Sequence, residues 1–525
     1  MSAARAVARQ TLGDSRTRTI SFGLLFFVVS ALQVLAYRNA YPTREERLEL
    51  ARTVADTQAV RLLYGVPHDL LTVGGYAAWR LGALTIFAGL WGVLGAVRAL
   101  RAEEDAGRAE LVLTGIVSRR QAFIGALVGI AAGAVILWLA LFAGLMTGRP
   151  GLGGSLYLAL ALLSPLPVFV GFGALASQLA PTRRTALALG TGVLAVALLL
   201  RMVADTTSLG WLRWTTPLGW AEELRPFADP QPLVLVLPAL ATAVLLVASG
   251  RIAEGRDIGA GLFAVSDSAQ PRLRLLGSPT ALALRSLRGT FIAWLAGIAA
   301  FALILGAVAG SVSSAVSDEL QQQLEKLGAG ANTPAGFLGF AFLFFILAVS
   351  LFVCFQIAAA REEEAEQRLE TLLALPVGRG RWLAGRLLVA AAGAAVLALA
   401  AGALTWLGAS SQEADVSFAR LVEAGANCLP VALLFLGLGA LAYAIVPGAA
   451  VTSAYALVAI AFLWEVIGGL LEAPDWLLGL SPFHQVGLIP AEPFAATAAL
   501  VMLAIAAAAG LAAVWAFARR DLVAA

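Results

Sequence analysis

Charged residues of both signs occur at the same spacing in two stretches of the chain. Residues 101–125 read RAEEDAGRAELVLTGIVSRRQAFIG, and residues 361–385 read REEEAEQRLETLLALPVGRGRWLAG. Carboxylates and guanidinium groups this close together suit ion pairing and protein docking. For catalysis, neither stretch offers a histidine partner or a persuasive metal-ligand pattern. At an offset of 260, the identical residues are Arg101, Glu103, Glu104, Arg108, Glu110, Leu113, Val117, Arg119 and Gly125, matching Arg361, Glu363, Glu364, Arg368, Glu370, Leu373, Val377, Arg379 and Gly385.

Both stretches lie between long apolar segments, which predicts two charged turns that join membrane helices. Because the Arg–Glu spacing is kept twice, we interpret these turns as docking surfaces for a partner outside the bilayer. A helix in such a turn would pass the partner's movement to both attached spans. The alternative is a solvated turn whose arginines mark the cytoplasmic side. The candidate coupling residues are Glu103, Glu104, Arg108, Glu110, Glu363, Glu364, Arg368 and Glu370.

The composition indicates an all-α polytopic membrane protein. Of the 525 residues, 60% are hydrophobic and 13% are charged, and the apolar residues form many separate long runs. A bilayer core of about 30 Å accepts helices of about 20 apolar residues, whereas no soluble fold buries so many such runs. The net charge of +3 is small for this length, which argues against nucleic-acid binding. Cys354 and Cys428 lie in or beside apolar runs, so neither a disulfide framework nor a zinc site is expected.

About twelve transmembrane helices are expected. Arginines before the first span, and Arg183 and Arg184 after the fourth, favour a cytoplasmic N-terminus. An even number of spans then places both termini on the cytoplasmic side. The predicted spans are residues 19–37, 79–99, 122–147, 155–180, 185–204, 231–250, 290–310, 335–359, 383–407, 428–446, 450–470 and 493–517.

Three segments are predicted to lie on the outer side. Thr43 and Glu46 form a capping-box pattern that begins a helix at residues 43–63. A second outer helix is expected at residues 315–327, where leucines recur at helical spacing. Residues 205–230 resemble an aromatic interfacial stretch, because they contain Trp211, Trp214 and Trp220.

Further matches indicate that the chain is an internal duplication. A Gly-Ala block matches at an offset of 266, a Trp and a Pro match at 265, and an Arg–Asp pair matches at 264. Chance explains the Gly-Ala block alone, but not charged and aromatic matches in one order. The expected domains are a first six-helix repeat (1–250), a cytoplasmic linker (251–278) and a second six-helix repeat (279–525). Even-numbered repeats run parallel, which predicts a pseudo-dimer. The matched residues are Gly171, Gly173, Ala174, Leu175, Ala176, Pro181, Trp211, Pro217, Arg256 and Asp257 with Gly437, Gly439, Ala440, Leu441, Ala442, Pro447, Trp476, Pro482, Arg520 and Asp521.

Two ionisable residues fall inside predicted spans, where charge is costly and marks function or pairing. Arg201 lies near the end of the fifth span and Glu465 within the eleventh, at an offset of 264. We expect the two side chains to face each other along a translocation pathway. The alternative is that each is satisfied within its own half. His68 and His484 are expected to form local hydrogen bonds.

The motif Arg-x-Glu-x-x-Leu-x-x-x-Val-x-Arg, at Arg108–Arg119 and Arg368–Arg379, resembles the loop after the second span of ABC-2-type exporter permeases. In that family the loop contains the coupling helix that contacts the ATP-binding subunit. The Pro376–Val377 pair is common in the family, whereas the first copy has Ile116–Val117. The fused twelve-span form is similar to actinobacterial exporters of polyketide antibiotics and other drugs.

The resemblance implies an exporter of hydrophobic or amphipathic compounds in a bacterial cytoplasmic membrane. A P-loop ends in Lys-Ser or Lys-Thr, and the sole lysine, Lys326, is followed by Leu327. ATP and Mg are therefore expected on a separate partner subunit, in two copies, and the chain itself is not expected to be an enzyme. Other expected partners are membrane lipid and the small-molecule cargo.

Two other classes remain open from the residues alone. A proton-coupled secondary transporter needs acidic relay residues within spans, and Glu465 is the exception to their scarcity. A membrane-embedded enzyme would need carboxylates such as Glu103 and Glu363 to act in catalysis rather than in partner binding.

Overall fold

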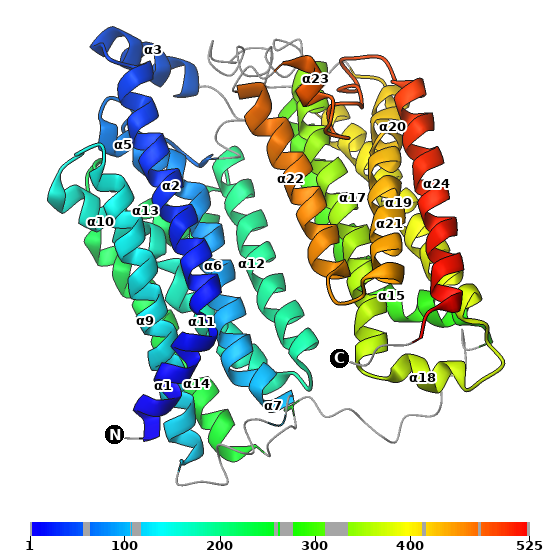
Figure 1. The fold of residues 1–525 in the computed structure, drawn as a ribbon. Coiled ribbons are helices and arrows are strands. Elements are labelled where there is room, and N and C mark those ends of the chain that lie inside the picture. The colour runs from blue at the N-terminus through cyan, green and yellow to red at the C-terminus, as the bar shows by residue number, and fades with distance from the viewer. Residues whose placement is uncertain are drawn as a thin grey trace. The chain divides into compact units, whose positions relative to one another are not determined.

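The computed structural model describes the chain as two helical units, Met1–Ala269 and Gln270–Ala525 (Figure 1). The boundary between them falls within the predicted linker, residues 251–278. Every regular element in the described part of the chain is a helix. The described residues are 3–55, 64–105, 107, 117–256, 261–262, 277–309, 334–411, 416–470 and 474–521.

The first unit contains long helices joined by short helical turns. Its elements are α1 (Ala3–Asp14), α2 (Arg16–Ala40), α3 (Arg44–Ala55), α5 (Val73–Arg80), η1 (Leu81–Ala83), α6 (Leu84–Val97), the π-helix η2 (Arg98–Ala102), α7 (Glu103–Asp105), α9 (Arg119–Met146), α10 (Leu152–Leu163), α11 (Pro165–Leu179), α12 (Arg183–Thr206), η3 (Gly210–Thr215), α13 (Pro217–Glu223), η4 (Pro232–Leu235) and α14 (Val236–Gly255).

The second unit follows a similar order. Its elements are α15 (Pro279–Ala309), α17 (Pro334–Ala365), α18 (Arg368–Leu373), α19 (Arg379–Ser410), α20 (Phe418–Ala426), α21 (Cys428–Ile445), α22 (Ala450–Leu470), α23 (Asp475–Leu478) and α24 (Ala496–Arg519).

The predicted polytopic membrane fold is confirmed. Eleven segments of the described chain are long and apolar enough to cross a membrane. The remaining predicted span, residues 450–470, is the apolar helix α22. The eleven segments are Arg16–Arg38, Val73–Asp105, Arg119–Met146, Leu152–Leu179, Arg183–Asp205, Pro232–Gly255, Pro279–Ala309, Pro334–Ala365, Arg379–Ser410, Phe418–Ile445 and Ala496–Arg519.

Local sequence signals set the starts of several helices. At α9, the Ser118 hydroxyl accepts a hydrogen bond from the Gln121 amide, and the Gln121 side chain accepts one from the Ser118 amide. Thr43 and Glu46 form the same reciprocal contact at α3, which confirms the start of the predicted outer helix. Residues 56–63 and the second predicted outer helix, 315–327, lie outside the described residues.

The fourth span of each unit consists of two helices. In the first unit the break is at Ser164, directly before Pro165, and in the second it is at Asn427. A proline near a helix start supplies no backbone N–H, so these sequences favour a new helix over a continuous one. The side-chain amide of Asn427 donates to the Gly487 carbonyl at 2.9 Å, which gives this buried polar side chain a partner at the break.

The same helix pairs dominate the packing within each unit. In the first unit these pairs are α2 with α9, α6 with α11, and α11 with α14. In the second they are α15 with α19, α17 with α21, and α21 with α24. Both cysteines lie in this packing: Cys354 on α17 and Cys428 on α21 are buried, free thiols.

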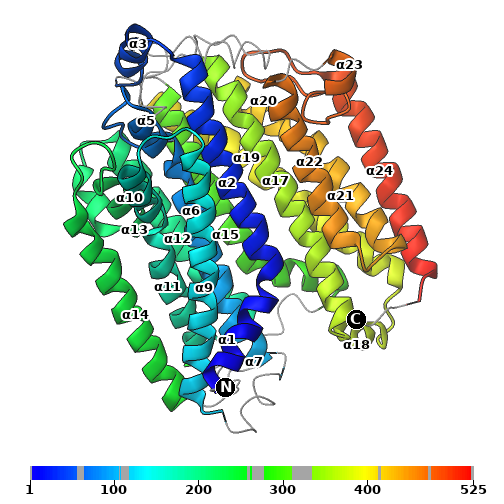
Figure 2. The ribbon, with the colours of Figure 1, turned by 60° about the vertical axis from the view of Figure 1, so that its left-hand side comes forward.

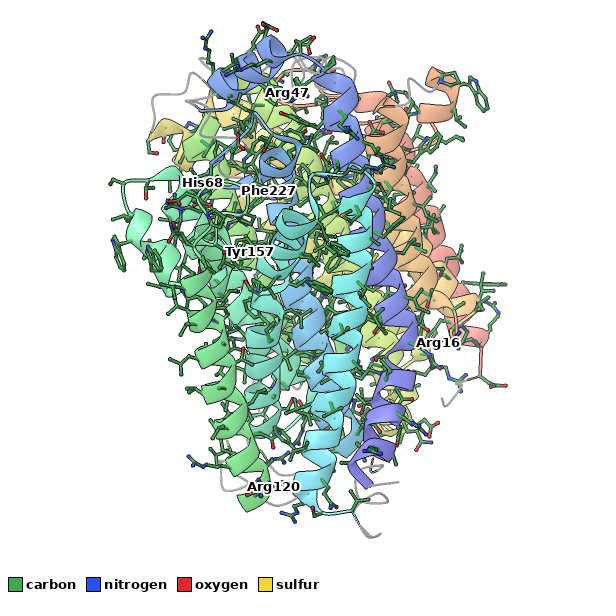
Figure 3. The ribbon with its side chains drawn as sticks, turned by 90° about the vertical axis from the view of Figure 1, so that its left-hand side faces the viewer. Arg16, Arg47, His68, Arg120, Tyr157 and Phe227 are labelled. Carbon is green, nitrogen blue, oxygen red and sulfur yellow. The ribbon has the colours of Figure 1, made fainter. Side chains whose placement is uncertain are left out.

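Each unit has one end that carries its charged turn, called here the turn end. Figure 2 shows α1 and α7 at the turn end of the first unit, and α3 and α5 at its opposite end. In the second unit, α18 lies at the turn end, and α20 and α23 lie at the opposite end. Figure 3 shows His68, Tyr157 and Phe227 at the end of the first unit opposite Arg120.

Candidate functional site

The charged turn of the first unit is attached to the last helix of that unit. Arg256, the residue that follows α14, contacts both carboxylate oxygens of Glu104 at 2.5 and 2.7 Å. Arg101 contacts the same carboxylate at 3.1 Å, and its side chain is 1% exposed. Arg119 donates to the Arg256 carbonyl at 2.7 Å. Glu104 therefore joins the second span to the end of the last.

The second unit has the same set of contacts at the matched positions. Arg520, after α24, contacts both oxygens of Glu364 at 2.8 Å. Arg361 lies 3.7 Å from Glu364, whose side chain is 1% exposed. Arg379 donates to the Arg520 carbonyl at 2.5 Å. In both units one guanidinium nitrogen reaches both carboxylate oxygens, and such charge-assisted contacts are stronger than neutral hydrogen bonds.

The predicted coupling residues consequently separate into inward and outward groups. Glu104 and Glu364 point into their units, and Glu363 forms an ion pair with Arg386. Glu103 lines a cavity described below. Arg368 and Glu370 are exposed on α18, whereas Arg108 and Glu110 lie outside the described residues. The coupling role of all eight residues stays a prediction.

Helix α18 is a short bridge between two spans. It begins after Gln367, whose φ of 60° reverses the chain at the end of α17. Leu369 is fully buried and anchors one side of α18, whereas Arg368 and Leu375 are 57% and 58% exposed. A fixed inner side and a charged, partly apolar outer side are suited to contact with another protein.

Changing Arg520 to Met should destabilise the protein, because Glu364 would keep a buried charge without its main partner. Loss of one partner from a buried pair costs roughly 3–5 kcal/mol. Thermal melts in detergent should show a large fall in melting temperature. The neighbouring exposed Arg519 is the matched control, and Arg519→Met should change the melt little. Adding Glu364→Gln to Arg520→Met should restore part of the loss, and a lack of recovery would contradict this account.

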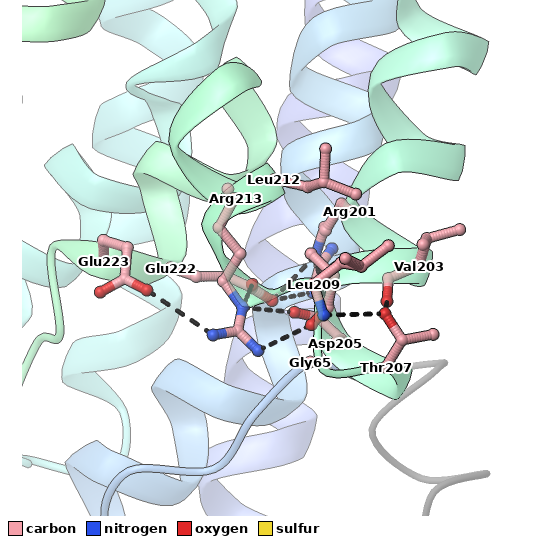
Figure 4. Close-up of polar contacts among 12 residues, drawn as sticks. Gly65, Arg201, Val203, Asp205, Thr207, Leu209, Leu212, Arg213, Glu222 and Glu223 are labelled. Atoms are coloured by element: carbon pink, nitrogen blue, oxygen red, sulfur yellow. Dashed lines mark hydrogen bonds and ion pairs between the residues drawn. The ribbon is translucent and has the colours of Figure 1, made fainter.

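At the opposite end of the first unit, Arg201 is the centre of a buried ionic network (Figure 4). Its side chain is 3% exposed, and its Nε donates to Glu222 at 2.8 Å and lies 3.4 Å from Asp205. Arg213 donates to the other oxygen of Asp205 at 2.7 Å. Glu223 contacts Arg225 at 2.7 Å and Arg213 at 3.8 Å. Three arginines and three carboxylates thus balance each other.

The sequence brings these groups together through α13. Thr216 caps this helix by accepting a hydrogen bond from the Gly219 amide, and Pro217 occupies its first position. The helix presents Glu222 and Glu223 one after the other towards the arginines of α12 and η3. A cavity of about 50 Å³, lined among others by His68, adjoins the network on its Glu222 side.

Burial raises the pKa of Glu222 to about 7, with a further upward contribution from Asp205 and opposing ones from Arg201 and Arg213. Between its ordinary value of 4.5 and about 7, the folded protein keeps a proton that the unfolded chain releases. The contribution of Glu222 to stability is therefore present below pH 4.5 and is lost as the pH rises through 7.

Glu222→Gln should make stability less sensitive to pH. The side-chain oxygen of glutamine still accepts a hydrogen bond from Arg201, but the amide does not titrate. The melting temperature of the variant, relative to wild type, should rise between about pH 5 and about pH 8, because the wild-type contribution is lost over this range. His68 is present in both proteins, so its titration cancels in the comparison. Glu45→Gln, exposed on α3, is the control. A difference that stays constant across this range would refute the assignment.

Glu465 of the second unit has a partner within its own unit. His484 Nδ1 lies 3.2 Å from Glu465 Oε1, and the carboxylate side chain is 7% exposed. This agrees with the expected local hydrogen bonding of His484. Arg201 and Glu465 thus each have a partner within their own unit, as the alternative interpretation expected, and their part in a translocation pathway stays a prediction. Across the described residues, no group of three His, Cys, Asp or Glu side chains is placed to hold a metal.

Sequence reasoning missed most of the Arg201 network. One signal was present, since Asp205 follows Arg201 at i+4 on the same helix and such pairs interact. Arg213, Glu222 and Glu223 come from later elements, and no spacing in the sequence indicates that they converge. Trp211 and Trp214, in contrast, are 62% and 50% exposed, as an interfacial stretch requires.

Comparison with known proteins gives the family. Residues 47–253 and 276–518 match the family described as "Multidrug efflux system permease Rv1217c, C-terminal domain". The chain is also 32% identical over 505 residues to the multidrug efflux system permease protein Rv1217c of Mycobacterium tuberculosis (strain ATCC 25618 / H37Rv). That alignment covers 95% of this chain and 91% of the relative.

The chain belongs to the Rv1217c family of multidrug efflux permeases. The prediction of a multi-pass permease is therefore confirmed. The family match includes both charged turns, the Arg201 network and the Glu465–His484 pair. The carboxylates Glu104 and Glu364 thus lie within the matched ranges, whereas their partners Arg256 and Arg520 lie just beyond them.

Proposed function

We propose that the chain is the transmembrane permease subunit of an ABC exporter. It would move a hydrophobic or amphipathic, drug-like compound outward by alternating access, driven by ATP and Mg on a separate subunit present in two copies. The chain itself has no catalytic role in this proposal. Membership of a multidrug efflux permease family supports the cargo class, because the Mycobacterium tuberculosis relative is named a multidrug efflux permease.

The observation that carries the proposal is the exposed bridge α18 on a fixed base. Its outward Arg368 and Glu370 are available to a partner, whereas Glu364 behind it is locked to Arg520. A push on α18 would therefore reach the spans α17 and α19 and the end of α24. This is what a coupling helix must do in an ABC-2-type permease.

The matched contacts of the two units support the predicted duplication into two parallel repeats. Glu104 with Arg256 and Glu364 with Arg520 are related by offsets of 260 and 264, as are the backbone contacts of Arg119 and Arg379. We place the turn ends, with both termini, on the cytoplasmic side of a bacterial cytoplasmic membrane, where an ATP-binding partner would be found.

Replacing Arg368 and Glu370 with Ala should remove the partner without unfolding the chain. Tagged protein from native membranes should copurify a P-loop ATPase, and the double variant should lose it, because both side chains lie on the exposed side of α18. Copurified protein is identified by mass spectrometry and its ATPase rate is measured.

The matched control is Arg44→Ala with Glu45→Ala, an exposed Arg and Glu on α3 at the opposite end of the first unit. This variant should keep the ATPase. Equal melting temperatures of both variants exclude unfolding as the cause. Absence of any copurified ATPase from the wild type would count against the ABC proposal itself.

The Glu465–His484 pair favours one second candidate, a proton-coupled secondary transporter. A carboxylate that is 7% exposed beside a histidine is a group that can exchange a proton within a membrane protein. Transport in vesicles decides between the candidates. Export that stops on ATP depletion and continues with a protonophore fits the ABC exporter, whereas the reverse response fits the secondary transporter.

A further inference from the structure

The turn end of the first unit contains a cavity of about 130 Å³ where α1 packs on α9. Its walls come from α1, α2, η2, α7, α9 and the end of α14. Leu100, Phe123 and Ala126 give it an apolar side, and Arg18, Arg98 and other charged groups give it a polar side. The cavity adjoins the charged turn, because Glu104, Arg119 and Arg256 also line it.

Two of the cations that line the cavity have no carboxylate partner in the described part of the chain. Arg18 and Arg98 form no ion pair there, although Asp14 and Glu103 line the same cavity. The Nε atom of Arg18 is buried without a hydrogen-bond partner, and its guanidinium carbon lies 5.5 Å from the centre of the Trp91 ring. Arg256, in contrast, is neutralised by Glu104. In total, four arginines and three carboxylates line the cavity, an excess of one positive charge.

Arg98 is the first residue of the π-helix η2. Gly173 and Gly439 are matched positions of the two units. A methyl group added at Gly173 would meet Ala96 at 2.9 Å, and one added at Gly439 would meet Ile357 at 3.2 Å. We therefore treat Ala96 and Ile357 as equivalent, and they are 261 residues apart (357 − 96). Arg101 and Arg361 are 260 apart (361 − 101). The first unit thus has one more residue between Ala96 and Arg101 than the second unit has between Ile357 and Arg361. A π-helix accommodates one extra residue within a continuous helix.

The contribution of Arg98 to this charge is specific to the first unit. The residues of the second unit between Ile357 and Arg361 are all alanine, so no register gives Arg98 a cationic counterpart. A role shared by both units, such as contact with a partner at each turn, would need the charge in both. The cavity therefore points to a ligand that binds once per chain.

The chemistry of the cavity identifies the ligand. Two unpaired guanidinium groups suit a phosphate, whose oxygens accept several charge-assisted hydrogen bonds. Beyond Arg18, the apolar side chains of Ile20 and Leu24 are 56% and 61% exposed on α2, along a membrane span. Basic pockets at the ends of membrane helices bind anionic lipid head groups. We propose that this cavity binds the phosphate of an anionic phospholipid, whose acyl chains follow α2.

The test compares wild-type chain in phosphatidylcholine with and without phosphatidylglycerol. Native mass spectrometry should show phosphatidylglycerol retained in preference to phosphatidylcholine. The double change Arg18→Gln and Arg98→Gln should weaken this retention at least about tenfold, the loss expected for a charge-assisted contact. Arg16→Gln with Arg120→Gln is the matched control, because both side chains are exposed near this end and neither lines the cavity.

The alternatives give distinct results. If the double variant keeps its preference for phosphatidylglycerol, the lipid lies elsewhere and the proposal is wrong. If inorganic phosphate raises the melting temperature as much as phosphatidylglycerol does, the site takes a free phosphate and the lipid assignment fails. If neither probe binds, the cations serve an acidic protein surface and the proposal also fails. Equal melts of all variants in phosphatidylcholine show that the fold is retained.

Discussion

In each unit a carboxylate inside the protein lies between the second span and the arginine that follows the last span. Taking both ions out of water costs several kcal/mol per ion, so the pair persists only with close, two-oxygen contact. Glu104 and Glu364 provide that contact and use a second arginine from their own helix. Glu104 and Glu364 thereby anchor the start of each charged turn to the end of the last span, so that a partner bound there would act on a fixed corner of the unit.

At the opposite ends, the fifth spans of the two units make a similar connection with different chemistry. Arg201 on α12 reaches Glu222, and Glu465 on α22 reaches His484, so each contacts the segment that precedes the last span. The first connection is a network of three arginines and three carboxyl groups, whereas the second pairs one carboxyl group with a histidine. The two units therefore make the same connection with different ionisable groups.

The sequence predicted the membrane class, the span positions and the outer capping box at Thr43, because apolar runs and caps depend on local spacing. It also identified Glu104 and Glu364 as a repeated pair, but it did not predict their contacts with Arg256 and Arg520 inside each unit. Contacts of this kind join residues about 150 apart, and no local pattern encodes them. The same limit hid Glu222 from prediction.

The burial of Cys354 and Cys428 makes the protein convenient for reporter chemistry. Both thiols lie in helix packing, at 1% and 0% exposure, and the sequence contains no other cysteine. The native chain should therefore react little with a thiol-reactive spin label or fluorophore. Single cysteines introduced at exposed places could then follow conformational exchange between the transport states, with the two natural thiols left in position.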